Sequence, residues 1–128
     1  MEIKQGLKYA KTHEWVQVTG SSARIGISDY AQQQLTDIVY MELPDKGAKI
    51  KKGQTFGVLE SVKAVEDIYA PVSGTVLQKN QNVIDNPDLL NNDPYNAWLI
   101  EIKLDNDKEL NELMDDKAYT QFLATQKH

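Results

Sequence analysis

Two apolar, β-prone runs that flank a single lysine constrain this chain more than any other feature. Residues 55–59 precede the lysine, and residues 65–69, rich in β-branched and aromatic side chains, follow it. The segment Glu60–Ala64 between them is long enough only for a tight reversal, so the pattern predicts an antiparallel hairpin with Lys63 at its tip. The tip lacks the Asn-Gly or Asp-Gly pair that favours short hairpin turns. We therefore expect something besides turn formation, such as recognition by an enzyme, to shape this sequence.

A simpler interpretation is that Lys63, one of 13 lysines, is an ordinary solvated side chain. Composition alone favours that interpretation. The pattern along the rest of the chain has to overturn it.

Further alternating segments predict a mainly β fold around this hairpin. Residues 14–19 and 23–27 predict a second hairpin, and other strands are predicted at residues 38–43, 48–50, 75–79 and 98–104. The side chains expected to face the core are Val16, Val18, Ile25 and Ile27 in the second hairpin, and Trp98, Ile100, Ile102 and Leu104 in the last strand. Many short strands with few helices favour a sandwich or barrel.

Short helices are predicted between the strands. Ser28 is a good capping residue for a helix over Tyr30–Leu35. Asn86 before a proline predicts one helical turn over Asp88–Leu90.

The tail is predicted to be helical over about residues 106–126. Asn106 and Glu109 have the spacing of a capping box, and Asp116 is expected to cap a further helix. We thus expect one mainly β domain over residues 1–128, with the lysine hairpin at about 55–74 and short peripheral and C-terminal helices.

Composition narrows the classes of function. Nineteen acidic and 14 basic side chains give a net charge of −5, which disfavours nucleic acid as a partner. The sequence contains no run of about 18 apolar residues, so no membrane span is expected. Without cysteine there is no disulfide or thiolate ligand, and His13 and His128 alone supply a metal site poorly. The start resembles neither a signal nor a transit peptide, so a cytoplasmic location is expected; a missing transit peptide would instead indicate the mitochondrial matrix.

Several separated motifs together resemble the lipoyl domains and, among them, the H-protein family of the glycine cleavage system. The hairpin motif runs through Glu60–Ala64 to Ala70–Gly74, and the other motifs lie at residues 8–10, 13–16, 25–28, 42–44, 53 and 92–95 and in the C-terminal helices. The resemblance covers nearly the whole chain and implies a lipoyl-type barrel-sandwich hybrid. The lipoyl domains of oxo-acid dehydrogenases also resemble this chain, but they are usually connected by flexible linkers to a catalytic domain. Biotin carriers usually place methionines where this chain has Val62 and Ala64, so lipoate is favoured.

The resemblance implies a non-catalytic, monomeric carrier with lipoate attached covalently to Lys63, as N6-lipoyllysine, by a lipoate ligase or a lipoyl/octanoyl transferase. The implied partners are a pyridoxal-phosphate-dependent glycine decarboxylase that loads an aminomethyl group, a folate-dependent aminomethyltransferase that removes it, and a dihydrolipoamide dehydrogenase that reoxidises the arm. One alternative is an H-like protein that relays lipoyl or octanoyl groups during lipoate assembly. Another is an interaction module whose lysine is never modified.

The resemblance also assigns contact residues. Glu14, Asp67 and Thr12 stand at positions implicated in holding the arm or its aminomethyl group, although Glu14 and Asp67 could equally be solvated charges. An acid–base pair between His13 and Glu14 is not expected, because neighbours in a strand face opposite sides.

Recognition by the lipoylating enzyme is assigned to residues on and after the hairpin tip. Glu60, with Val62, Ala64 and Gly74, is expected to contribute, although Glu60 and its neighbour Glu66 could equally be solubilising charges. For Gly53 and Gly74, the residues themselves predict tight turns that need a glycine.

Overall fold

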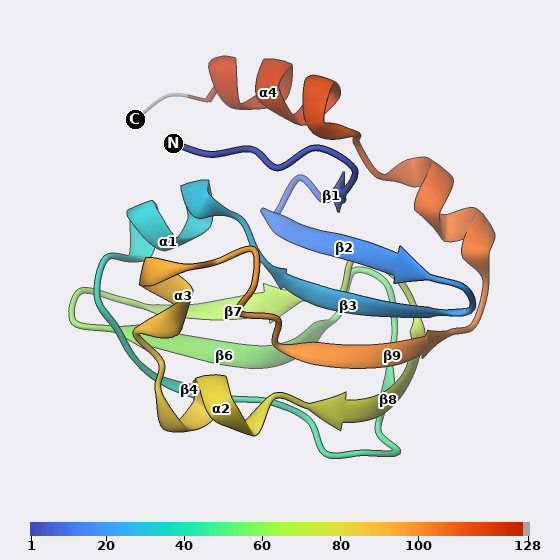
Figure 1. Cartoon of the computed structure of the whole chain (residues 1–128), viewed down its shortest axis with the longest axis horizontal. Helices are drawn as coiled ribbons and strands as arrows, with labels where there is room; N and C mark the ends of the chain where they lie inside the picture. Colours follow the sequence, from blue (N-terminus) through green and yellow to red (C-terminus); the bar gives the residue numbers. More distant parts are fainter. Residues whose placement is uncertain (127–128) are drawn as a thin grey trace.

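Two β-sheets facing each other form the body of the protein (Figure 1), in a computed structural model that describes residues 1–126. The larger sheet has the order β1-β2-β3-β9-β8-β5, and the smaller has the order β4-β6-β7. The larger sheet consists of β1 (Lys8–Tyr9), β2 (Glu14–Thr19), β3 (Ser22–Ile27), β9 (Ile100–Leu104), β8 (Gly74–Lys79) and β5 (Lys49–Ile50); the smaller consists of β4 (Ile38–Glu42), β6 (Thr55–Ser61) and β7 (Val65–Tyr69). Within the described residues neither sheet closes into a barrel, and the expected mainly β sandwich is confirmed.

Short helices surround the sandwich. They are α1 (Asp29–Leu35), α2 (Gln81–Asp85), α3 (Leu89–Asn92), the 3₁₀ helix η1 (Asp107–Glu112) and α4 (Asp116–Ala124). As predicted, the Ser28 hydroxyl caps α1 by accepting from the Ala31 amide at 3.2 Å. Across residues 1–126 we find no helix with the length and hydropathy that a bilayer span requires.

Three apolar clusters stabilise these layers. One joins the smaller sheet to α1–α3, one is formed by the larger sheet together with Ala70 and Val72, and one lies beneath α4. Val16, Ile25 and Ile27 are buried as predicted, but Val18 is 42% exposed. Since β1 pairs with β2 only as far as Val16, the rest of β2 is a free edge, and Val18 lies there.

Two helix predictions need correction in the segment after β8. Asn86 does not cap the following turn; it ends α2, and its side-chain Nδ2 donates to the Asn82 carbonyl at 3.1 Å. No side chain caps the start of α2, so no capping signal marked this helix in the sequence. The next helical turn, α3, begins at Leu89 and ends at Asn92.

The capping pattern at the C-terminal end also differs from the prediction. Asn106 does cap η1, but the Glu109 carboxylate accepts hydrogen bonds from the amide and hydroxyl of Ser73 at 2.7 and 3.0 Å instead of closing a capping box. Asp115, not Asp116, caps α4 by accepting from the Ala118 amide at 2.8 Å.

The hairpin is shorter than the predicted span of about 55–74, because β7 ends at Tyr69. Gly74 is the first residue of β8, and it is buried. A Cβ at Gly74 would collide with the main-chain carbonyl of Lys103, so glycine is needed there for close approach of β8 and β9 and not for a turn. Gly53, with a φ of +85°, does occupy the predicted turn.

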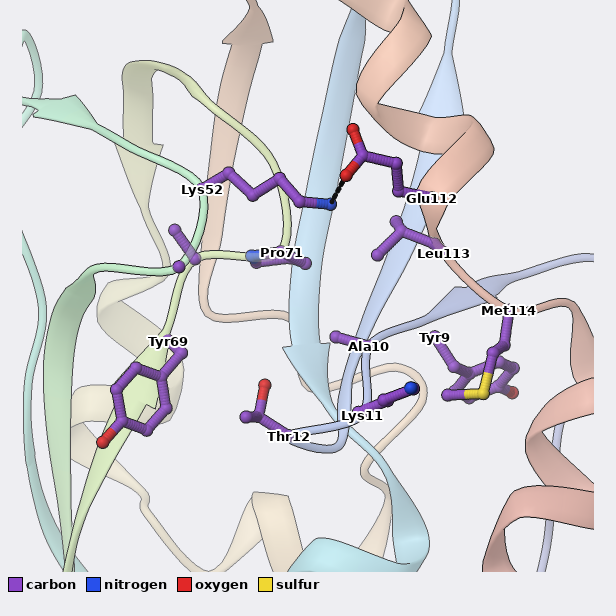
Figure 2. Close-up of a pocket in the computed structure, with 12 residues that line it drawn as sticks. Tyr9, Ala10, Lys11, Thr12, Lys52, Tyr69, Pro71, Glu112, Leu113 and Met114 are labelled. Atoms are coloured by element: carbon purple, nitrogen blue, oxygen red, sulfur yellow. Dashed lines mark ion pairs between the residues drawn. The ribbon is translucent and has the colours of Figure 1, made fainter.

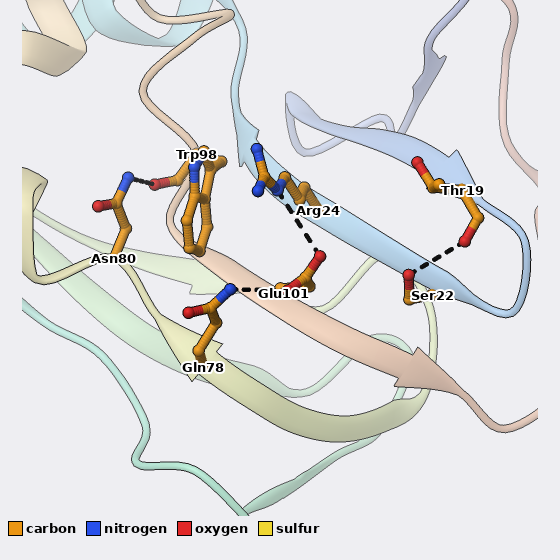
Figure 3. Close-up of polar contacts among 7 residues, drawn as sticks. All are labelled: Thr19, Ser22, Arg24, Gln78, Asn80, Trp98 and Glu101. Atoms are coloured by element: carbon orange, nitrogen blue, oxygen red, sulfur yellow. Dashed lines mark hydrogen bonds and ion pairs between the residues drawn. The ribbon is translucent and has the colours of Figure 1, made fainter.

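The outer face of the larger sheet carries a polar ladder across three strands (Figure 3). The Glu101 carboxylate accepts from Nε2 of the Gln78 side chain at 2.8 Å and lies 3.7 Å from Nε of Arg24. The Arg24 guanidinium in turn lies 4.5 Å from the ring centroid of Trp98. Trp98 precedes β9 and covers this ladder, so the prediction that it faces the same way as Ile100 is wrong.

Candidate functional site

Lys63 lies exposed at the tip of the β6–β7 hairpin, as predicted. Glu60 pairs with Val65, so residues 61–64 form the turn. The Ser61 hydroxyl accepts from the amides of Lys63 and Ala64 at 3.2 and 3.0 Å, and the Ser61 amide donates to the Ala64 carbonyl at 2.8 Å. Ser61 therefore takes the place of the absent Asn-Gly pair. The tendency of serine to form such turns is the signal that our sequence analysis missed.

The expected recognition residues fall into two places. Glu60, Val62 and Ala64 lie on the tip around Lys63, and Val62 is 69% exposed. Gly74 lies apart from the tip, at the start of β8 in the larger sheet. Of the ion pairs present within residues 1–126, none involves Lys63.

A cleft of about 310 Å³ opens beside the hairpin tip. Its lining includes Lys63 together with all three predicted contact residues, Thr12, Glu14 and Asp67. The apolar part of the lining comprises Ile27, Ala31, Leu35, Leu59, Ala64 and Ile68. The fold thus brings together residues from β2, α1, β6 and β7 around one cavity next to the lysine.

Glu14 is the buried charge of this cleft. Its side chain is only 3% exposed, so the interpretation of Glu14 as a solvated charge is wrong. The Thr12 hydroxyl donates to Oε1, and the Tyr69 amide donates to Oε2 at 3.3 Å. Burial raises the pKa of Glu14 to about 7, although the hydrogen bonds from Thr12 and Tyr69 act in the opposite direction. A carboxylate so placed favours a cation that reaches it.

Asp67 differs from Glu14 although both line the cleft. Asp67 is exposed on β7, where it pairs with Val58 of β6. The neighbouring Glu66 is also exposed. Asp67 is therefore a solvated charge at the rim, and an ion pair there is worth about 0–1 kcal/mol.

His13 connects the cleft to the C-terminal helix. Its Nδ1 lies 2.8 Å from the Tyr119 hydroxyl, which lies 2.7 Å from the hydroxyl of Ser28. The ring packs against Tyr30 at a centroid distance of 4.6 Å, and burial lowers the pKa of His13. The His13 backbone is in the left-handed region, with a φ of +79°. His13 thus bonds to Tyr119 and not to Glu14, a pairing across 106 residues that sequence reasoning missed.

Figure 2 shows a second cavity, of about 410 Å³. Thr12 lines both, and Glu14 accepts from Thr12 and from the main chain of Tyr69, so this bonded group marks the border between them. At the far end, Lys52 and Glu112 form an ion pair at 3.4 Å. Apart from Thr12, this cavity contains none of the predicted site residues.

In the part of the chain that the structure describes, we find no group of three or more histidine, aspartate or glutamate side chains that could hold a metal ion. His128 lies outside the described residues.

A two-sheet sandwich that presents a lysine on a hairpin tip defines a carrier domain of the lipoyl type. The family model described as "Glycine cleavage H-protein" matches residues 7–126. The chain belongs to the glycine cleavage H-protein family. Proteins of this family are the lipoyl-bearing carriers of the glycine cleavage system, and membership implies interaction with the enzymes of that system.

Relatives from bacteria and archaea agree over almost the full length. A glycine cleavage system H protein from Thermoanaerobacter sp. (strain X514) is 50% identical over 123 residues, which cover 96% of this chain and 98% of that protein. A probable glycine cleavage system H protein from Pyrococcus furiosus is 50% identical over 126 residues, covering 97% and 94%. The crystal structure of a glycine cleavage system H protein from Mycobacterium marinum matches with a TM-score of 0.87 and 30% identity, covering 95% of this chain and 99% of that one.

Proposed function

We propose that Lys63 is the lipoyl attachment site through which this chain serves the glycine cleavage system. The observation that carries the proposal is an exposed lysine at a braced hairpin tip, beside a cleft that contains a buried carboxylate. Lipoate supplies a dithiolane whose sulfurs accept the one-carbon unit and the electrons, and this cysteine-free chain has no sulfur of that kind.

Attachment needs Lys63 as a nucleophile. A ligase first joins lipoate to ATP, giving lipoyl-adenylate and pyrophosphate. The Lys63 amine, having lost a proton, then attacks the acyl carbon; an amide forms, AMP leaves and a second proton is released. The exposure of Lys63 and the absence of an ion pair to it within residues 1–126 leave this amine accessible.

The cleft fits an arm of this chemistry. Its apolar lining, including Leu59 and Ile68, suits the hydrocarbon part of the arm, and Glu14 suits a cationic aminomethyl cargo. A sheltered charge-assisted hydrogen bond contributes about 1.5–3 kcal/mol, compared with about 0–1 for an exposed ion pair. Glu14 is therefore the principal holding group, Thr12 orients it, and Asp67 adds a weaker rim charge.

In this proposal residues 1–128 act as one monomeric, non-catalytic carrier unit in the cytoplasm. It receives the aminomethyl group from a pyridoxal-phosphate-dependent glycine decarboxylase and delivers it to a folate-dependent aminomethyltransferase. A dihydrolipoamide dehydrogenase then collects the electrons. Tethering keeps the cargo at a high effective concentration for each docked enzyme.

The attachment is tested by intact mass after incubation with lipoate ligase, lipoate and ATP. We expect one lipoyl increment on the wild type, none on Lys63→Arg, and one on Lys117→Arg, which alters an exposed lysine of α4. An unmodified wild type, with a ligase that acts on another substrate, would contradict the assignment.

Carrier and relay roles are separated by glycine-dependent carbon dioxide exchange with the decarboxylase. The names of the relatives support the carrier. We expect the lipoylated chain to sustain exchange; lipoylation without exchange would favour the relay of lipoyl or octanoyl groups.

A further inference from the structure

We propose that Asn91 is a positioning residue for the acylation of Lys63, because its side chain holds the turn before β4 and that turn holds the hairpin tip. This inference rests on the proposed attachment at Lys63. It concerns a residue on α3 that lies outside the cleft lining.

The carboxamide of Asn91 is bonded through both its oxygen and its nitrogen to the segment of residues 32–38, which runs from α1 through the turn into the start of β4. Its Nδ2 donates to the Thr36 carbonyl at 2.7 Å and to Oε1 of Gln32 at 3.1 Å. Its Oδ1 accepts from the Ile38 amide at 3.0 Å. One half-buried side chain thus holds three points of this segment.

The segment needs such a clamp because its backbone is unfavourable by itself. Thr36 ends α1 with a φ of +62°, a conformation that a β-branched residue rarely adopts. The pairing of β4 with β6 is also irregular between Ile38 and Tyr40. The Asp37 carbonyl and the Ile38 amide belong to one peptide unit and point in opposite directions. Because that carbonyl bonds to Val62 of the hairpin, the Ile38 amide points away from β6, and Asn91 holds this end of β4 from the opposite side.

The clamped turn is joined directly to the tip. The Val62 amide donates to the Asp37 carbonyl at 3.0 Å, and Ile38 pairs with Ser61. In Figure 1 the β6–β7 hairpin extends past the sandwich beside the segment that links α1 to β4. The bonds of Ser61 shape the turn internally, whereas the bond from Val62 fixes it to the body of the protein.

An acylating enzyme must receive Lys63 in one position relative to the rest of the domain. A tip that moves relative to the sandwich presents the lysine correctly for only part of the time, which weakens productive binding. The Asn91 clamp therefore lowers the KM for the apo chain and has little influence on the chemical step.

Three variants test this role. Asn91→Leu keeps a similar size and removes every hydrogen bond, and Asn91→Asp keeps the acceptor for Ile38 but loses both donated bonds. Asn92→Leu is the matched control, because Asn92 is the exposed neighbour on the same helix. The readouts are hydrogen exchange at the Val62 amide and the KM and kcat of lipoate ligase for each apo chain.

In Asn91→Leu we expect exchange at Val62 to accelerate about tenfold and the KM to rise about fivefold, with kcat changed by less than about twofold. Asn91→Asp should also raise both quantities, because an acceptor-only oxygen then faces the Thr36 carbonyl in place of a donor, and Asn92→Leu should match the wild type. Should Asn91→Leu not fold, Asn91→Asp and Gln32→Met, which removes one acceptor for Nδ2, carry the same test.

An unchanged KM in the Asn91 variants, or unchanged exchange at Val62, would overturn the positioning role while leaving the attachment site intact. If the wild type itself is not acylated, the proposed attachment fails and the positioning role fails with it. The two failures are therefore distinguishable.

Discussion

The burial of Glu14 lowers the stability of the folded protein when the carboxylate is ionised, and the same charge is proposed to hold the cargo. Its folded-state pKa of about 7 lies above the ordinary value of 4.5, because burial disfavours the charged form. Between these two values the folded protein binds more protons than the unfolded chain. The free energy of unfolding therefore falls as the pH rises from about 4.5 to about 7. Below pH 4.5 Glu14 is protonated in both states, and its contribution to the free energy of unfolding is fully favourable.

This behaviour gives a first prediction. Glu14→Gln keeps the shape and can still bond to Thr12 and to the Tyr69 amide, but it cannot ionise. We expect the variant to gain up to about 3 kcal/mol of stability relative to the wild type between pH 4.5 and pH 8. Urea unfolding of both proteins across this range measures the difference, and a difference independent of pH would contradict the raised pKa.

Cargo retention should rise with pH, whereas the free energy of unfolding falls, because Glu14 binds a cation only when it is ionised. Retention by the lipoylated, aminomethyl-loaded wild type should improve as the pH rises through about 7. Glu14→Ala should lose the cargo about tenfold faster at pH 8, the loss expected from one charge-assisted hydrogen bond.

Release of formaldehyde and ammonia into buffer measures that decay. Asp67→Asn is the comparison at the rim, where an exposed ion pair of about 0–1 kcal/mol changes the decay by no more than about fivefold, less than the change expected for Glu14→Ala. Equal decay of Glu14→Ala and the wild type would remove Glu14 from this role.

The sequence predicted which residues line the cleft, but it did not predict the long-range contacts that place them. Lys63, Thr12, Glu14 and Asp67 were all predicted, and they line one cleft. The burial of Glu14 was not predictable, because it depends on the Tyr69 amide 55 residues away. The Asn91 clamp reaches across 55 residues to the Thr36 carbonyl, beyond any local pattern.

Alternation and turn residues predicted most strands at the scale of elements. The strand predictions are wrong where a long-range contact sets the direction of a side chain. Trp98 is an example, because it packs on Arg24 and lies before the start of β9. The helix α2 was missed because no side chain caps it. The prediction of a capping box is wrong because the Glu109 carboxylate accepts from Ser73, which lies 36 residues away.

Gly74 provides a prediction for the packing of β8 on β9. Gly74→Ala places a methyl group against the Lys103 carbonyl and should cost about 3 kcal/mol of unfolding free energy. Gly20→Ala is the control: its φ is +61° and its surroundings are open, so only backbone strain of about 1 kcal/mol is expected. Urea denaturation measures both, and a smaller loss at Gly74 than at Gly20 would contradict the close-approach argument.

For the whole molecule, α4 links the end of the chain to its functional cleft. Figure 1 places α4 across the N-terminal segment, and the Tyr9 and Tyr119 rings stack with centroids 4.4 Å apart. Tyr119 also bonds to His13, the residue before Glu14, and to Ser28, the cap of α1. The left-handed backbone at His13 thus sits beneath a helix that begins 103 positions later.

Tyr119→Phe tests this link because it removes the hydroxyl and keeps the stacked ring. The half-buried His13 Nδ1 and the buried Ser28 hydroxyl then lose a common partner, so we expect a loss of about 1–3 kcal/mol in urea unfolding. Hydrogen exchange at Glu14 and Trp15 should accelerate as well, because the turn that sets the carboxylate is no longer held. Tyr40→Phe, at a tyrosine that is 48% exposed, should change neither quantity. Loss of stability without faster exchange near Glu14 would mean that α4 supports the core but does not position the cleft.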